Sequence, residues 1–303
     1  MDSLSKELST AYILQIHKNP NQVNNFIKQI LSTEQSDIYV HIDKKSYHLL
    51  HDKIFKNPRV TILRECVDVV WGDISQIDAT LLLLREVLSS GKKYDFVCLR
   101  SGQDLLVKNG FGEHLKNNKY KIFMSAYYIG KRDAAASFVN VKWPKFTRQL
   151  IINPYHPYRL VRRIVALLYR LGLNLIPNSN KLPENYVIYE GSQWFCLPYN
   201  VAHFIIDFLE NNKWFYKVFE ESLVPDQFFF QTIIMNSKYK YDVVNDNLMY
   251  IKFGDDLKSR NNPITLKIEH IDTIKASNQY FARKFDENVD NQVIEYYSNH
   301  VTI

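Results

Sequence analysis

The sequence lacks several features that would place it in a common class. It has three cysteines in 303 residues, none at a spacing typical of a metal site. No apolar run reaches the ~20 residues that a membrane-spanning helix needs, and the N-terminus lacks the charged-then-apolar pattern of a signal peptide. We therefore expect a cytoplasmic protein in which Cys66, Cys98 and Cys196 are buried free thiols rather than a disulfide pair or a site.

Motifs for phosphate and metal binding are also missing. Neither Gly-x-Gly-x-x-Gly nor Gly-x-x-x-x-Gly-Lys occurs, so neither a dinucleotide-binding fold nor a P-loop is indicated. No Asp-x-Asp stands at the end of an expected strand, so the usual carboxylate pair for a divalent cation is absent. The net charge of +6 is modest for this length. It suits an anionic small substrate or a membrane surface better than a nucleic acid.

The chain is nonetheless rich in material for a core, since 46% of it is hydrophobic and 14% aromatic. In the first half, short apolar strands alternate with amphipathic helices, which predicts a mostly parallel sheet with helices on both faces. The expected strands are 12–16, 38–43, 60–63 and 94–99, and the expected helices are 20–31, 46–55 and 75–88. Ligands of such sheets bind beyond the C-terminal strand ends. Asp43 and the turns at 71–72 and 101–104 follow such ends.

The pattern is looser in the second half. Expected strands are 193–197, 241–244 and 248–251, and expected helices are 201–211, 265–276 and 291–297. Pro225 predicts a turn that presents Asp226 and Gln227 at the start of an aromatic helix, where free N–H groups favour anions and oriented side chains.

Residues 155–171 form a basic amphipathic helix with arginines at 159, 162, 163 and 170. Two interpretations stay open. The helix lies on an anionic membrane surface, or it packs on the domain with its arginines in water.

Six short segments, in this order and spacing, resemble one enzyme family. They are His-Ile-Asp-Lys-Lys-Ser at 41–46, Val-Val-Trp-Gly-Asp-Ile-Ser at 69–75, Leu-Arg-Ser-Gly-Gln-Asp at 99–104, Gly-Ser-Gln-Trp-Phe at 191–195, Pro-Asp-Gln at 225–227 and Phe-Ala-Arg-Lys-Phe at 281–285. Together they resemble the core-2/I-branching β-1,6-N-acetylglucosaminyltransferase family, which also contains the peptide O-xylosyltransferases. The matches run from about residue 12 to residue 286.

The resemblance implies an α/β fold of the GT-A glycosyltransferase type. It implies an inverting enzyme that uses a UDP-sugar and needs no metal or other cofactor. We expect a single domain over 1–303, with the nucleotide-binding half at about 10–120. The acceptor-binding half and a C-terminal extension would take up about 121–303.

On the donor side, the resemblance makes Asp43 the contact to uracil and gives the backbone of Leu14 to the same base. Trp71 and Ser101 fall where the family lines the donor pocket. Asp43 could instead cap the following turn, and Trp71 could belong to the core. His17 and His41 are expected to be structural, and Asp104 to hold its turn.

The charge of the leaving diphosphate needs neutralising in the transition state. By resemblance Lys284 does this with its neighbour Arg283, although the two could also be a solvated pair. Arg260 is the nearby candidate for the family's other diphosphate arginine, with a poor match.

The chain departs from the family at the general base, which is the glutamate of a Pro-Asp-Glu motif. Here the motif reads Pro-Asp-Gln, and the amide of Gln227 cannot accept the proton of the acceptor hydroxyl. Three explanations stay open. The chain is an engineered inactive variant, or Asp226 or Glu190 serves as the base, or the protein binds a UDP-sugar or glycan without transferring it.

We expect an enzyme that moves a sugar of the UDP-GlcNAc or UDP-Xyl type to a glycan hydroxyl. Heavy use of Asn, Lys, Ile and Tyr points to a bacterium, and hence to surface polysaccharide synthesis. A lipid-linked acceptor would be met at the inner face of the membrane through the 155–171 helix. The alternative function is a non-catalytic binding protein on the same fold.

Overall fold

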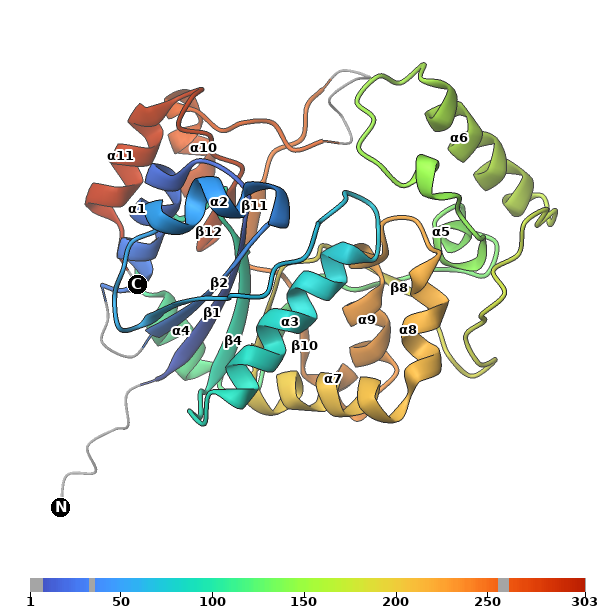
Figure 1. Ribbon diagram of the computed structural model, residues 1–303, viewed down its shortest axis with the longest axis horizontal. Coiled ribbons are helices and arrows are strands. Elements are labelled where there is room, and N and C mark those ends of the chain that lie inside the picture. Colours follow the sequence, from blue (N-terminus) through green and yellow to red (C-terminus); the bar gives the residue numbers. More distant parts are fainter. Residues whose placement is uncertain (1–7, 33–35, 256–261, 303) are drawn as a thin grey trace.

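A seven-stranded sheet forms the centre of the computed structural model, which describes residues 8–32, 36–255 and 262–302 (Figure 1). Its order is β10-β6-β9-β4-β1-β2-β3. The strands are β1 (Thr10–Ile16), β2 (Ser36–Ile42), β3 (Val60–Ile62), β4 (Phe96–Ser101), β6 (Ile122–Met124), β9 (Phe195–Pro198) and β10 (Val243–Asn245). Only β9 runs against its neighbours, β4 and β6. The predicted α/β class, with a mostly parallel sheet, is confirmed.

Helices cover both faces of this sheet. α3 (Ser75–Ser89) and α7 (Tyr199–Asn211) pack on one face. Toward the other lie α1 (Pro20–Ile30), α4 (Phe111–Asn117), α11 (Asn291–His300) and a small sheet of β11 (Met249–Ile251), β12 (Phe281–Arg283) and β5 (Asp104–Leu106). Every residue of β1 is buried. The strand is therefore a continuous apolar run rather than an alternating one, as expected for a parallel strand covered on both sides.

Smaller elements complete the molecule. On the far side of α3 and α7 from α1 lie α5 (Ala136–Asn140), α6 (Pro157–Arg170), α8 (Lys213–Glu220), α9 (Phe229–Met235) and the pair β7 (Tyr127–Tyr128) and β8 (Tyr189–Glu190). α2 (Tyr47–Leu50) and α10 (Ile271–Ala276) are short helices near α1 and α11. Within the described residues, no helix is both long and apolar enough to cross a membrane.

Two predicted helices are shorter than their patterns indicated. The helix expected over 46–55 is helical only in short pieces, because the side chain of Asn24 bonds both the carbonyl of Lys53 and the N–H of Phe55. The helix expected over 265–276 begins with a 3₁₀ turn at Ile268 and continues as α10, because Lys267 before it is extended and the N–H of Leu266 donates to the carbonyl of Lys284. In both cases tertiary hydrogen bonds hold part of the backbone out of the helical conformation.

The C-terminal segment packs against the first half of the chain. The amide of Gln29 donates to the carbonyls of Tyr297 (2.9 Å) and Val301 (3.2 Å), and the ammonium of Lys18 lies 2.6 Å from Asp286. These contacts place β12 and α11 beside the region expected to bind the nucleotide, although the sequence grouped them with the second half.

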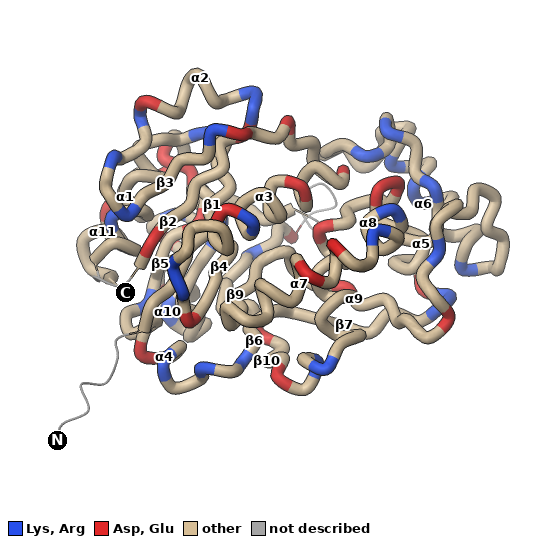
Figure 2. The backbone as a smooth tube through the Cα atoms, turned by 60° about the horizontal axis from the view of Figure 1, so that its bottom comes forward, with Lys and Arg blue, Asp and Glu red and all other residues tan. Residues whose placement is uncertain are grey.

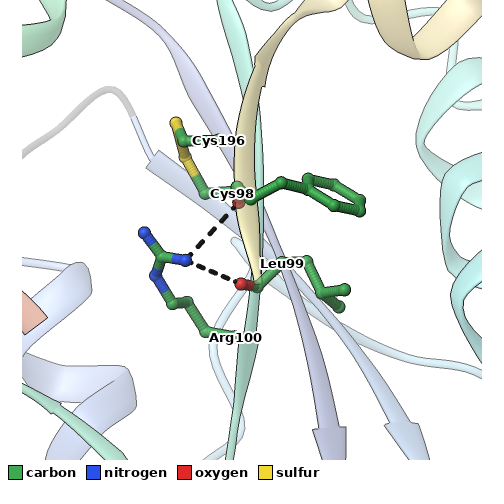
Figure 3. Close-up of a disulfide and its surroundings, with 5 residues drawn as sticks. Cys98, Leu99, Arg100 and Cys196 are labelled. Carbon is green, nitrogen blue, oxygen red and sulfur yellow. Dashed lines mark hydrogen bonds between the residues drawn. A yellow bond between two sulfur atoms is a disulfide. The ribbon is translucent and has the colours of Figure 1, made fainter. Parts of the chain in front are cut away.

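The expectation of three free thiols is wrong for two of them. Cys98 on β4 and Cys196 on β9 form a disulfide (Figure 3). The antiparallel register sets the two residues directly opposite each other, with their Cα atoms 4.2 Å apart. Cys66 is free and half-buried.

His41 at the end of β2 predicts an acid-sensitive stability. The buried Nε2 atom of His41 accepts the N–H of Val67 at 2.9 Å, which supports its predicted structural role. Burial lowers the pKa of His41 to about 4. Between about pH 4 and the ordinary value of 6.5, the unfolded chain binds a proton that the folded chain does not. The free energy of unfolding should therefore fall as the pH drops through this window.

His41→Gln should flatten this fall, because the glutamine oxygen can accept the same N–H without titrating. The measurement is the thermal midpoint from pH 7 to pH 4.5, with the exposed His203→Gln as control. An equally steep fall in parent and His41→Gln would contradict the assignment.

Candidate functional site

The C-terminal ends of the parallel strands meet at one edge of the sheet. His17 follows β1, Asp43 follows β2, and Ser101 ends β4. Because β9 runs antiparallel to β4, its beginning lies at the same edge, and Trp194 immediately precedes it. This edge collects most of the predicted site residues.

Asp43 is buried and caps the turn after β2. Its Oδ1 accepts the backbone N–H of Lys45 at 2.9 Å, and its Oδ2 lies 3.5 Å from the ammonium of the same residue. That ammonium also contacts Asp68 and donates to the carbonyl of Val69 at 2.6 Å. Asp43 thus caps its turn, and the cap holds the carboxylate at the edge beside the 68–69 loop.

Asp104 organises the turn after β4, as predicted. Its carboxylate accepts the N–H of Ser101 at 2.8 Å and the hydroxyl of Ser101 at 3.0 Å, and the residue is completely buried. Ser101 is therefore locked in place by two hydrogen bonds to one side chain.

Arg283 is the central cation of the edge. Pairing of β12 with β5 sets it opposite Asp104, and its Nε lies 3.5 Å from the Oδ1 of that residue. Its guanidinium carbon lies 4.2 Å from the ring centre of Trp194. Burial lowers the pKa of Arg283, while Asp104 and Asp226 oppose this. The interpretation of Arg283 as a solvated residue is wrong.

Lys284 adds a second cation at the same place. Burial lowers the pKa of this half-buried ammonium, and the charges of Lys18 and Arg283 lower it further, against the effect of Asp286. Asp286 is itself engaged by Lys18 at 2.6 Å and by the amide of Asn19 at 2.9 Å. The result is a crowding of positive charge, which a bound anion would relieve.

The turn that carries Asp226 is a separate 3₁₀ turn, Pro225–Gln227, rather than the start of the aromatic helix. α9 begins at Phe229, so Asp226 and Gln227 precede the aromatic helix instead of standing at its start. The backbone anchors both ends of the turn. The N–H of Val224 donates to the carbonyl of Gly72 (3.0 Å), and the carbonyl of Gln227 accepts the N–H of Gly191 (2.8 Å).

Two carboxyl groups near this turn have raised pKa values. Burial raises the pKa of Asp226 to about 6, against the opposing charge of Arg283. Burial also raises the pKa of Glu190, which lies on β8 next to Gly191. Of these two carboxyl groups, only Asp226 has Arg283 among the causes of its pKa shift. Asp226 is therefore the one that interacts electrostatically with the central cation.

Leu14, Trp71 and Arg260 are the other residues predicted on the donor side. Leu14 is inside the sheet, with Val40 on one side and Arg100 on the other, so its backbone does not reach the edge. Trp71 is 41% exposed and not part of the core, and the guanidinium of Arg162 lies 5.7 Å from its ring centre. Arg260 lies outside the described residues.

Arg100 is a buried charge that the sequence analysis missed. It is fully buried in β4, and its Nη1 donates to the carbonyls of Leu99 (2.9 Å) and Phe195 (3.5 Å), as Figure 3 shows. Its guanidinium carbon lies 4.1 Å from the ring centre of Phe281. Burial lowers its pKa to about 10, against the charge of Asp104. The sequence does contain a signal for this buried charge, which is an arginine within an otherwise apolar strand.

In the part of the chain that the structure describes, no three His, Cys, Asp or Glu side chains are grouped so that they could hold a metal ion.

Comparison with known proteins gives a family and several relatives. The model of the Core-2/I-Branching enzyme family matches residues 10–278. A xylosyltransferase of Ciona intestinalis is 23% identical over 94% of this chain and 33% of its own length. Xylosyltransferase sqv-6 of Caenorhabditis elegans is 24% identical over 97% of this chain and 37% of its own length. The chain thus spans about a third of the length of these curated relatives.

Among solved structures, mouse xyloside xylosyltransferase 1 aligns with 76% of this chain and 83% of its own, at 11% identity and a TM-score of 0.33. A likeness of this degree supports no conclusion about the site.

Gly191, between the two carboxylates, yields a prediction about packing. A Cβ atom there would lie 1.8 Å from the backbone oxygen of Ser125, which cannot move without disturbing β6 and β7. Gly191→Ala should therefore lower the free energy of unfolding by about 1–3 kcal/mol. Gly130→Ala is the control, because its Cβ would meet only the side chain of Asp133. Chemical denaturation measures both, and equal stabilities would contradict the close approach.

Proposed function

The chain belongs to the Core-2/I-Branching enzyme family, and from that premise we propose that it transfers a sugar from a UDP-sugar to a hydroxyl group of a glycan. One observation carries the proposal. Arg283, held between Asp104 and Trp194, interacts electrostatically with Asp226, whose pKa is raised to about 6. A cation for the leaving group thus lies within electrostatic range of a carboxylate that can accept a proton.

In the proposed reaction, the acceptor oxygen attacks the anomeric carbon from the face opposite the diphosphate. The new carbon–oxygen bond forms as the bond to the diphosphate oxygen breaks, and UDP leaves with the electron pair. The negative charge that develops on UDP is stabilised by Arg283 and Lys284, so the step needs no metal. The hydroxyl proton passes to a carboxylate, and the anomeric configuration is inverted.

Asp226 is the proposed general base. Its pKa of about 6 leaves it ionised at pH 7 and more basic than an ordinary aspartate. Glu190 also has a raised pKa, but Arg283 is not among the causes of its shift. Gln227, next to Asp226, has an amide that can hydrogen-bond the acceptor hydroxyl without accepting its proton.

The donor is proposed to lie over the first half of the chain, about 10–120, with Asp43 on the uracil and Ser101 and Trp71 along the pocket. The described relatives are named xylosyltransferases, so UDP-xylose is the first donor to test and UDP-GlcNAc the second. The second half, about 121–303, would hold a glycan acceptor of a bacterial surface polysaccharide. A lipid-linked acceptor would bring the protein to the inner face of the membrane, with the 155–171 helix as its peripheral contact.

A non-catalytic protein that binds a UDP-sugar or glycan is the second candidate. It is favoured by Gln227, which stands where the family has its base, and it predicts donor binding without transfer.

Donor binding is the first test. Calorimetric titration with UDP and a panel of UDP-sugars, in EDTA, should show UDP and one sugar nucleotide binding. Lys284→Gln should weaken UDP binding about tenfold or more, because one charge-assisted hydrogen bond to phosphate is lost. Arg85→Gln, on the outer part of α3, should bind as the parent does. If neither UDP nor any UDP-sugar binds, the donor site is misplaced.

The proposed base predicts a rate that falls with acid. In the parent, the transfer rate should decrease as the pH drops below about 6, where Asp226 takes up a proton. Asp226→Asn should lower the rate about 10²- to 10⁴-fold at pH 7 and above, with a smaller difference below about pH 6, where Asp226 of the parent is protonated too. Transfer by Gln227→Glu but not by the parent would indicate a transferase fold that lacks a working general base. UDP binding without transfer in either protein would favour the binding-protein candidate.

A second readout separates a charge effect from damage to the fold. The pKa of Asp226 is higher in the folded protein than the ordinary 3.8, so ionisation opposes folding as the pH rises from about 4 through 6. Asp226→Asn should therefore have a higher thermal midpoint than the parent at pH 8, with little difference at pH 4. A lower midpoint at pH 8 would mean that the carboxylate is structural.

A further inference from the structure

One segment of the chain contains no acidic residue. All 32 aspartates and glutamates lie outside residues 134–183, which instead carry eight lysines and arginines. Figure 2 shows Lys and Arg positions along α6, at the end of the molecule away from α1. Two of the eight pair with acidic residues outside the segment, Lys142 with Glu221 at 2.7 Å and Arg148 with Asp73 at 3.0 Å. The segment as a whole still carries an excess of positive charge.

The same segment exposes large apolar side chains. α6 has fourteen residues and none is buried, although three leucines and an isoleucine lie along it. Ile164, Leu167 and Leu175 are 57%, 54% and 71% exposed. We call the exposed apolar side chains of this segment the α6 patch. Its main members are Leu150, Ile152, Ile164, Leu167, Leu171 and Leu175. Contiguous exposed apolar surface of this kind marks an interaction site.

Charged and apolar side chains lie on different faces of α6. Leu160, Ile164, Leu167 and Leu171 recur at helical spacing and form one stripe. Tyr169 is on the opposite side, where its hydroxyl contacts the amide of Asn140 at 2.8 Å.

Along one flank of the stripe runs a row of arginines, Arg159, Arg163 and Arg170, again at helical spacing. An apolar stripe with a basic flank is the arrangement of a helix that lies in the plane of a membrane interface.

Two other arginines of the segment face the protein. Arg162 donates to the carbonyls of Thr147 and Gln149 and lies over the ring of Trp71. Arg148 is buried, 3.0 Å from Asp73 and 2.7 Å from the carbonyl of Glu220. These contacts attach the segment to the 71–73 loop, whose Gly72 carbonyl binds Val224 just before the Asp226 turn.

We propose that the α6 patch and its arginine row dock on the surface of a lipid bilayer that contains anionic lipids. This deepens the proposed function, on which it rests, by naming the surface that presents the acceptor. Because Arg148 and Arg162 tie the segment to the 71–73 loop, docking orients the Asp226 turn relative to the bilayer. An acceptor anchored in the bilayer then reaches the site from the α6 side.

Charge favours a membrane over a second copy of the chain. If two copies met through this patch, their arginine rows would approach each other, and the segment has no acidic residue to pair with them. Anionic headgroups supply the missing negative charge, and each arginine near such a surface strengthens binding.

The test is co-sedimentation of the whole chain with vesicles of phosphatidylcholine, alone or mixed with phosphatidylglycerol. The parent should pellet with the mixed vesicles only, and less at high salt. Arg163→Glu with Arg170→Glu should weaken this binding about tenfold or more. Lys213→Glu with Lys217→Glu, on α8 outside the segment, makes the same change in net charge and should bind as the parent does.

UDP binding by calorimetry should be the same in all of these proteins, so a failed membrane proposal is distinguishable from a failed donor site. The proposal is overturned if the parent does not pellet, or if the α8 control loses as much binding as the α6 variant. It is also overturned if the parent is a dimer in sedimentation velocity that Ile164→Ser converts to a monomer without any effect on vesicle binding.

Discussion

The burial of the Arg283 guanidinium is the constraint on which the rest of the site depends. A cation removed from water must be compensated nearby, and here Asp104 at 3.5 Å and the ring of Trp194 at 4.2 Å do so. Asp104 in turn bonds the backbone and hydroxyl of Ser101. One buried charge thus holds together β12, the turn between β4 and β5, and the beginning of β9, which are distant in the chain but meet at one edge of the sheet.

The same compensation explains why the edge is suited to chemistry. Asp104 is fully buried, whereas Asp226 senses Arg283 only as a minor opposing influence, so burial prevails and its pKa rises to about 6. On the cationic side, Lys284 lies near both Arg283 and Lys18, and its pKa is lowered. Displacing a diphosphate with a hydroxyl group requires a carboxylate basic enough to take the hydroxyl proton. It also requires cations that can bind the departing anion.

The acid-free segment differs from this edge in how its charges are satisfied. Near the site, Lys18, Lys45 and Arg283 each lie against an acidic side chain, and Arg283 also lies against an aromatic ring. On α6, Arg162 donates to the carbonyls of Thr147 and Gln149, while Arg163 and Arg170 are exposed beside apolar side chains. The division within one short segment follows from helical geometry, because residues one position apart on a helix point about 100° away from each other.

The sequence by itself determined the α/β class, the first four strands and the order of motifs, because apolar periodicity and short motifs are local properties of the chain. It also predicted Asp226 and Arg283 as candidate site residues. Only the tertiary structure decided that these two interact, that Cys98 and Cys196 are bonded, and that Leu14 lies too deep in the sheet to reach the edge. Each of these depends on strand order and register, which are set by contacts between segments far apart in the chain.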